Sequence, residues 1–132
     1  MNTKIVMTAS ALVMGALGVA ATFLPQEIAQ YLGLSSEGVM PLWIQIMGAL
    51  YFSYAMLNWT AKDSLIGGIY NRPIAIGNLV HFVVGALALV KGVTANPTLK
   101  VLLPFAVVYA VFAIAFGMIF FRSPVQSASS PS

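Results

Sequence analysis

The sequence predicts an all-α integral membrane protein, built as an up-down four-helix bundle with both termini in the cytoplasm. Hydrophobic residues make up 60% of the 132-residue chain and charged residues only 7%, whereas a soluble domain carries about 25% charged residues. Four apolar segments approach the roughly 20 residues that a spanning helix needs. The charged residues fall between these segments, where they orient a membrane protein.

Proline residues mark the ends of the predicted spans. Pro25 ends the first span, while Pro41 and Pro73 open the second and third at first-turn positions, where the missing N–H breaks no hydrogen bond. Pro104 lies in the first turn of the fourth span. The spans cover about residues 5–24, 41–59, 73–90 and 100–121, in one domain over residues 1–122 that precedes a flexible polar tail over residues 123–132. The alternative interpretation of residues 1–21 is a cleaved secretory signal.

The cations are distributed unevenly between the two sides of this four-span scheme. One side carries Lys4, Lys62, Arg72 and Arg122, and the other carries Lys91 and Lys100 with Glu27 and Glu37. The positive-inside rule therefore puts both termini in the cytoplasm.

The first connection is amphipathic, which favours a short helix at the membrane surface. We expect its apolar side chains to lie at the interface while its polar side chains face water. The apolar set is Ile28, Tyr31, Leu32 and Leu34, and the polar set is Gln26, Glu27 and Gln30.

Small residues favour close helix packing in lipid, where burying apolar surface gains little. Plotted at about 100° per residue, they gather on one side of the first, third and fourth spans. These stripes are Thr8, Ala11, Gly15, Gly18 and Thr22; then Gly77, Asn78, His81, Gly85 and Ala88; then Ala106, Ala110, Ala113 and Gly117. The opposite face of the third span suits lipid and carries Val80, Val83, Leu87 and Val90.

The second span carries polar residues on several of its sides. We therefore expect it to be the most enclosed helix or to face a second subunit. Gln45 and Asn58 on this span are interpreted as hydrogen-bond partners of neighbouring helices rather than as ligands of a small molecule.

Counting residues from the membrane edges predicts one polar cluster inside the bilayer. His81, the only histidine of the chain, lies near the middle of the third span. Antiparallel neighbours bring Tyr51 and Tyr109 to a similar depth, and Asn78 lies one turn nearer the cytoplasm, level with Tyr54. As a ligand site, these five residues would hydrogen-bond a quinone carbonyl, a sterol-like hydroxyl or a lipid head. As a structural feature, Asn78 and His81 would bond neighbouring helices and fix their register.

Arg72 also has two interpretations. It is a candidate ligand for lipid phosphate at the cytoplasmic surface, beside the positive end of the third span. As the alternative, it is a topological anchor of the positive-inside type and nothing more.

Several chemistries lack the residues that they need. The chain has no cysteine, and its acids, Glu27, Glu37 and Asp63, all lie in connections. Metal sites use several His, Cys or carboxylate ligands, and a catalytic histidine needs an acid to orient it. No catalytic or metal-binding residue is therefore predicted. No cofactor is predicted either, with quinone or haem as the alternatives, and a haem would draw a second axial ligand from a partner chain.

The chain resembles small bacterial four-helix membrane proteins of the DoxX-like type. The resemblance lies in the architecture and in the stretches QIMGALYFSYAMLNW and GGIYNRPIAIGNLVHF. It implies a four-helix bundle in a bacterial inner membrane, in a group of which some members are associated with quinone-linked sulfur oxidation. It assigns no functional residue to any position of this sequence.

These observations favour a non-enzymatic inner-membrane protein that is an accessory subunit or binds a hydrophobic or amphipathic small molecule or lipid. The alternative is a small quinone- or haem-associated oxidoreductase component that uses His81. A small-solute transporter or channel is the third hypothesis, which the lack of a polar stripe on all four spans disfavours. The expected partners are membrane lipids and a second copy or other subunits of a membrane complex, and not nucleic acid.

Overall fold

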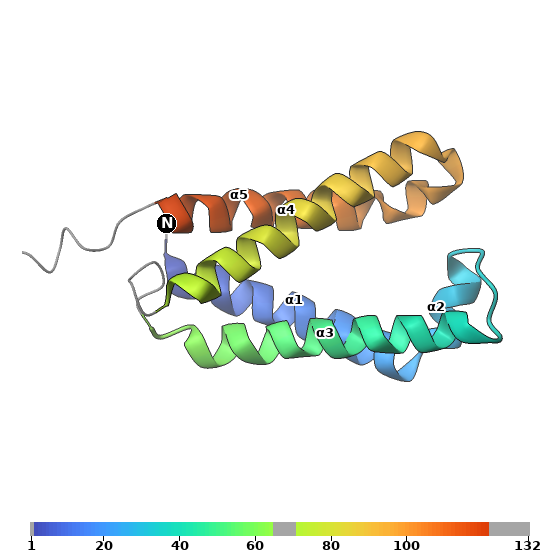
Figure 1. Ribbon diagram of the computed structural model, residues 1–132, viewed down its shortest axis with the longest axis horizontal. Coiled ribbons are helices and arrows are strands. Elements are labelled where there is room, and N and C mark those ends of the chain that lie inside the picture. Colours follow the sequence, from blue (N-terminus) through green and yellow to red (C-terminus); the bar gives the residue numbers. More distant parts are fainter. Residues whose placement is uncertain (1, 65–70, 122–132) are drawn as a thin grey trace, which may run out of the picture. The chain divides into compact units, whose positions relative to one another are not determined.

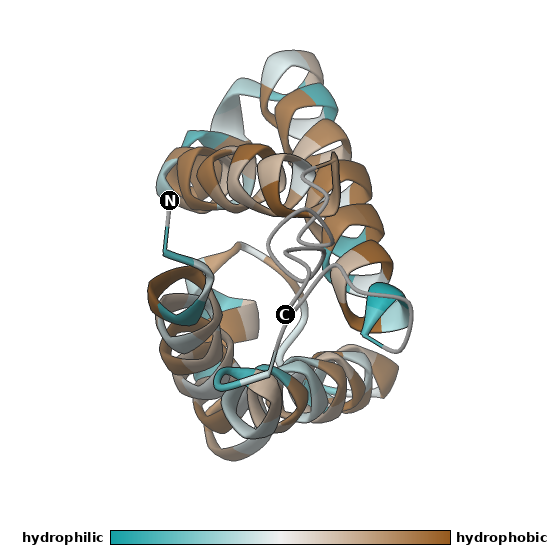
Figure 2. Ribbon diagram, turned by 90° about the vertical axis from the view of Figure 1, so that its left-hand side faces the viewer, coloured by the Kyte–Doolittle hydropathy of each residue, from teal (hydrophilic) through white to brown (hydrophobic). Residues whose placement is uncertain are grey.

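The computed structural model describes residues 2–64 and 71–121, and within them the secondary structure is helical throughout, without strands (Figure 1). The elements are α1 (Thr3–Phe23), α2 (Pro25–Tyr31), α3 (Val39–Ala61), α4 (Arg72–Ala95), the 3-10 helix η1 (Pro97–Leu102) and α5 (Leu103–Phe121). In this described part, α1, α3, α4 and η1 with α5 are each long and apolar enough to cross a membrane. Hydrophobic residues make up most of each long helix (Figure 2). The predicted helical, multi-pass character is therefore confirmed, while Arg122 and the predicted tail lie outside the described residues.

Pro97 decides where the third span ends and the fourth begins. Helix α4 runs beyond the predicted Val90 to Ala95, because Pro97 disfavours helical geometry at Asn96, which is extended with φ −134° and ψ 104°. The Asn96 side chain then accepts a hydrogen bond from the N–H of Thr98 and caps η1. The fourth span therefore begins as a 3-10 helix, and its α-helix starts only at Leu103, three residues later than expected from the sequence.

The chain divides into two compact units, which are described separately. The first comprises residues 7–60, with most of α1, all of α2 and most of α3. The second comprises residues 1–6 and 61–132 and contains α4, η1 and α5.

In the first unit, α1 and α3 run antiparallel and touch backbone to backbone. A Cβ atom added to Gly18 would lie 2.8 Å from the backbone N of Phe52, and one added to Gly48 would lie 3.0 Å from the carbonyl O of Gly18. Gly15 faces the Cβ of Ala55 at an ordinary 3.6 Å. Without side chains at these positions, the helices approach closely enough for extensive van der Waals contact, which is a main source of helix association in lipid.

Three hydrogen bonds accompany this glycine contact. The Asn58 side-chain amide donates to Ser10 Oγ at 3.0 Å, and the Ser10 hydroxyl donates to the carbonyl O of Met7 at 3.0 Å. The Gln45 amide donates to the carbonyl O of Thr22 at 3.4 Å. The structure thus confirms the interhelical role predicted for Gln45 and Asn58. The structure also shows that Ser10 is the partner of Asn58. The sequence did not indicate this role, because one hydroxyl group in an apolar helix produces no repeating pattern.

Helix α3 is the least buried of the four spans in the described chain. Its polar groups are not all turned inward, and the expectation that α3 is the most enclosed helix stays a prediction because the two units are not placed relative to one another. Asn58 is fully buried, but Gln45 and Ser53 are exposed, and Ser53 bonds the carbonyl O of Ala49 on its own helix. The alternative, that α3 faces a second subunit, stays a prediction.

In the second unit, α4 and α5 run antiparallel and pack through large aromatic side chains. Phe82 of α4 stacks on Phe116 with ring centroids 5.6 Å apart and contacts Phe112 at 5.0 Å. The buried residues of α5 are Ala106, Tyr109, Phe112, Phe116 and Ile119. Two residues of the small-residue stripe predicted to make the contact lie there, since Ala106 is buried and Gly117 faces Leu79 of α4. Aromatic side chains, which the sequence analysis did not expect at this contact, fill the space beside Phe82 and Gly85.

An ion pair joins the start of α1 to the turn after α3, and all its atoms belong to the second unit. Lys4 Nζ lies 2.7 Å from Asp63 Oδ1, and both side chains are well exposed. The hydrogen bond from Lys4 is the main reason that the pKa of Asp63 lies below its ordinary value, and the charges of Lys4 and Lys62 lower it further. This pair holds two segments distant in sequence at one end of the spans.

Replacing Gly18 or Gly48 by alanine is expected to destabilise the protein by about 1–3 kcal/mol, the usual range for overpacking. The new methyl group would meet rigid backbone atoms of the facing helix. Gly15→Ala is the matched control and should be tolerated, since its Cβ meets only the Ala55 side chain at an ordinary distance. Thermal unfolding in detergent would measure both effects, and equal midpoints for all three variants would contradict the close contact.

Lys4→Gln is expected to raise the pKa of Asp63 toward its ordinary value of 3.8. Because the folded-state pKa is lowered, the ion pair stabilises the protein above about pH 4 and loses that effect as the pH falls through the folded pKa. Asp63 is the only aspartate in the chain, so selective isotope labelling and carbon-13 NMR can follow its carboxyl group alone. Lys62→Gln, the control, should shift this pKa less, because Lys62 acts only through its charge.

Candidate functional site in the α4–α5 pair

The candidate site is a hydrogen-bonded histidine and tyrosine on two facing spans. His81 lies on α4 and Tyr109 on α5, and the antiparallel course of these helices brings both to the same level. His81 Nε2 and the Tyr109 hydroxyl O are 3.0 Å apart. The two rings have centroids 5.3 Å apart and are tilted by 53°. The structure thus brings together two of the five residues of the predicted polar cluster.

Gly85 makes room for this arrangement one turn after His81. A Cβ atom added to Gly85 would lie 2.6 Å from Cδ2 of Tyr109, so the tyrosine ring rests directly on the α4 backbone. With its ring in this position, the Tyr109 hydroxyl reaches His81. The sequence predicted that Gly85 lies on the inward stripe of the third span. It did not show that Tyr109 of α5 would lie against Gly85, because that depends on how the two helices pack.

Phe82 supports both rings from the side. Its ring meets that of His81 at 5.1 Å and that of Tyr109 at 5.1 Å, both nearly edge to face. Phe82 and Phe116 are fully buried, and Tyr109 is 4% exposed. The side chains of His81 and Tyr109 therefore pack against a cluster of aromatic rings, which restrains their motion. The sequence carries a signal for this cluster, since Tyr109, Phe112 and Phe116 recur at helical spacing, although that spacing alone does not distinguish a packing face from a lipid face.

Asn78 lies one turn before His81 on α4 and is fully buried. Its side-chain amide donates to the carbonyl O of Ile74 at 2.9 Å on the same helix. A short amide side chain easily reaches back one turn in a helix, and the interhelical bond expected for Asn78 in the structural interpretation stays a prediction. Asn78 therefore stays near the pair without joining the His81–Tyr109 bond.

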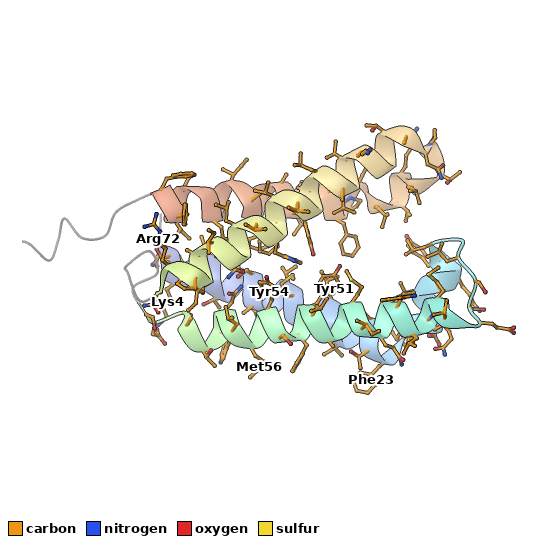
Figure 3. The ribbon with its side chains drawn as sticks, viewed as in Figure 1. Lys4, Phe23, Tyr51, Tyr54, Met56 and Arg72 are labelled. Atoms are coloured by element: carbon orange, nitrogen blue, oxygen red, sulfur yellow. The ribbon has the colours of Figure 1, made fainter. Side chains whose placement is uncertain are left out.

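Tyr51 and Tyr54 belong to α3 in the first unit. They extend from one side of that helix, with Met56 on the other (Figure 3). Both tyrosines are half-buried. Because the positions of the two units relative to one another are not determined, the five-residue cluster as a whole stays a prediction.

Arg72, the candidate for lipid phosphate, is the first residue of α4 and is exposed (Figure 3). Its guanidinium carbon lies 5.2 Å from the centroid of the Phe120 ring, at the end of α5. This cation–π contact orients the side chain along the end of the α4–α5 pair. Phosphate binding at Arg72 stays a prediction.

His81 and Tyr109 can each both donate and accept a hydrogen bond, and they need no carboxylic acid to do so. A neutral imidazole has one donor and one acceptor nitrogen, and a phenol hydroxyl both donates and accepts. Within residues 2–64 and 71–121, no three His, Cys, Asp or Glu side chains gather closely enough to hold a metal ion. The arrangement is therefore suited to recognising a hydrogen-bonding group, or to passing a proton with one.

Tyr109→Phe is expected to keep the aromatic packing and to remove the bond to His81, which is worth about 0.6 kcal/mol for an average bond of this kind in a membrane. Gly85→Ala should destabilise the protein more, by about 1–3 kcal/mol, because its methyl group displaces the tyrosine ring. Gly117→Ala on α5 is the control, since its Cβ would meet Leu79 at an ordinary 3.7 Å. Thermal unfolding in detergent ranks the three variants, and a Gly85→Ala variant as stable as Gly117→Ala would contradict the seat for Tyr109.

No known protein family, no curated protein and no solved structure matches this chain. The resemblance to DoxX-like proteins therefore stays a prediction. What the protein does has to be inferred from its own residues, and His81, Tyr109 and Gly85 are the most specific of them.

Proposed function

We propose that the protein is a non-enzymatic inner-membrane protein of bacteria that binds a hydrophobic or amphipathic small molecule or lipid, alone or as an accessory subunit of a larger complex. The observation that carries this proposal is the hydrogen bond between His81 and Tyr109 within the membrane-spanning α4–α5 pair. Ionisable side chains such as histidine are rare inside a membrane because burying them in lipid costs free energy, and they commonly mark functional sites.

The packing around the pair supports a role beyond joining helices. Phe82 already holds α4 and α5 together through Phe112 and Phe116, so the polar bond adds little to their association. By contrast, the buried Asn58–Ser10 bond has a clear structural role between α1 and α3. Tyr109 is buried, whereas His81 is half-buried.

The depth of His81 points to the chemistry of the ligand. His81 follows Arg72 by nine residues, or about 13 Å along a helix, which places it well below the headgroups if Arg72 lies at the membrane surface. A molecule that reaches it needs an apolar body and a hydrogen-bonding group, as in a quinone or a sterol-like alcohol. A quinone would also suit the alternative function, an oxidoreductase component, because a histidine–tyrosine pair can deliver a proton to a reduced carbonyl oxygen.

The topology that we propose is an up-down four-helix bundle with both termini in the cytoplasm. The antiparallel contacts within each pair, α1 with α3 and α4 with α5, support the alternation of direction. The cations Lys4, Lys62 and Arg72 outnumber Asp63 at one end of the spans, which supports the cytoplasmic side for that end.

Mass spectrometry of the protein purified from native membranes tests this function. The wild-type protein is expected to retain a small molecule in a fixed ratio, and His81→Ala is expected to lose it. Val83→Ala is the matched control, because Val83 is exposed elsewhere on α4 and should not affect binding. The same retained molecules in all three proteins would refute binding at His81, whereas haem absorbance or a quinone that vanishes with His81→Ala would favour the oxidoreductase alternative.

A further inference from the structure

The fourth span begins with an unusually long 3-10 helix. η1 covers six residues, Pro97–Leu102, whereas 3-10 runs longer than about three or four residues are uncommon, because their hydrogen bonds have poorer geometry than those of an α-helix. The Asn96 cap does not account for this, since a side chain that accepts from the N–H two residues later caps α-helices as well. Another residue therefore prevents α5 from beginning earlier.

Pro104 explains this geometry from the other end of η1. In an α-helix, the N–H of residue 104 would donate to the carbonyl O of Lys100. Proline has no N–H, and its ring would collide with that carbonyl group. The N–H of Leu103 bonds the carbonyl O of Lys100 instead, and the N–H of Leu99 bonds that of Asn96. Both are the i→i−3 bonds of a 3-10 helix, so Pro104 favours 3-10 geometry in the segment before it.

The start of η1 is held against α4. A Cβ atom added to Gly92 would lie 3.8 Å from Cδ1 of Leu99, so the leucine side chain contacts the backbone of α4 at this glycine. The N–H of Asn96 bonds the carbonyl O of Gly92 and closes α4. Leu99 therefore marks a level along α4 from which the position of Tyr109 on α5 can be counted.

The geometry of η1 brings Tyr109 level with His81. From Leu99 to Leu103 the chain rises about 8 Å at 3-10 spacing, and from Leu103 to Tyr109 it rises about 9 Å at α-helical spacing. The sum places Tyr109 about 17 Å from Leu99. His81 precedes Gly92 by eleven residues, or about 16.5 Å along α4. The two levels agree, in keeping with the 3.0 Å between His81 Nε2 and the Tyr109 hydroxyl O.

An α-helical η1 would present Tyr109 differently. Over the four residues from Leu99 to Leu103, a 3-10 helix turns about 480° and rises about 8 Å, whereas an α-helix turns about 400° and rises about 6 Å. Tyr109 would therefore be rotated by about 80° around the α5 axis and displaced by about 2 Å along it. A rotation of this size would move its ring away from Gly85, against which it now lies.

We propose that Pro104 is a positioning residue for the His81–Tyr109 pair. By keeping η1 in 3-10 geometry, it sets the rotation and the level at which α5 presents Tyr109 to His81. Pro104 is exposed and precedes Tyr109 by five residues, so it acts through the backbone of α5. This inference rests on the proposed function for the role of the pair as a ligand site, whereas the positioning itself can be measured without a ligand.

Nitrogen-15 NMR of the single histidine tests the positioning. The full-length protein, labelled at histidine and carrying no histidine tag, is measured in detergent, and Tyr109→Phe supplies the spectrum of His81 without its phenol partner. Pro104→Ala is expected to shift the ring nitrogen resonances of His81 to those of Tyr109→Phe. Pro73→Ala is the matched control and should keep the wild-type spectrum, since Pro73 lies in the first turn of α4, where its missing N–H breaks no helical bond.

An inserted alanine tests the rotation directly. Five α-helical residues turn about 500° and rise about 7.5 Å, which nearly matches the turn of about 480° and the rise of about 8 Å over four 3-10 residues. One alanine inserted after Val101 in Pro104→Ala should therefore restore the wild-type spectrum. The same insertion with Pro104 retained should remove the His81–Tyr109 bond, because a further 3-10 residue adds about 120° and about 2 Å.

A wild-type spectrum for Pro104→Ala, or one that the insertion fails to restore, would overturn the proposal. If Pro104→Ala does not fold, the insertion with Pro104 retained decides, since an unchanged His81 spectrum in that variant would also overturn it. Mass spectrometry of molecules retained by the same variants separates this inference from the proposed function. Spectra that change and recover as expected, with the same molecules retained throughout, would support the positioning by Pro104 and refute the ligand at His81.

Discussion

The need to satisfy every backbone N–H and C=O group without water governs this structure. In the bilayer, a helix meets that need within itself, and an open strand or irregular loop does not. The long apolar segments are therefore helices, and prolines stand at their ends, where a missing N–H breaks no helical bond. The same rule applies to side chains, since in the described residues every buried side-chain N or O atom has a hydrogen-bond partner.

The two pairs of spans solve the problem of association in different ways. In α1 and α3, Gly18 and Gly48 bring two backbones into contact, and Asn58 and Ser10 add a hydrogen bond. In α4 and α5, aromatic side chains fill the interface, and Gly85 accommodates the ring of Tyr109. Both pairs depend on shape complementarity, because moving apolar surface from lipid into a helix contact releases little free energy.

The two pairs of spans also differ in the hydrogen bonds that they contain. Ser10 and Asn58 are both buried and their hydrogen bond joins α1 to α3, so this bond has an evident structural purpose. His81 and Tyr109, by contrast, lie beside an interface that Phe82 already holds through Phe112 and Phe116. That contrast, rather than the rarity of histidine, distinguishes a candidate ligand site from a purely structural bond.

The sequence by itself determined the class of this protein, the number of long apolar spans and most of their bounds, because composition and proline positions act locally. It also singled out Asn58, Gln45, His81 and Tyr109, since polar residues stand out in an apolar helix. Only the tertiary structure decided that aromatic side chains, beside small residues, join α5 to α4, and that Gly85 seats Tyr109. Helical periodicity shows which residues share a face, but which neighbour that face meets depends on the shapes of both surfaces together.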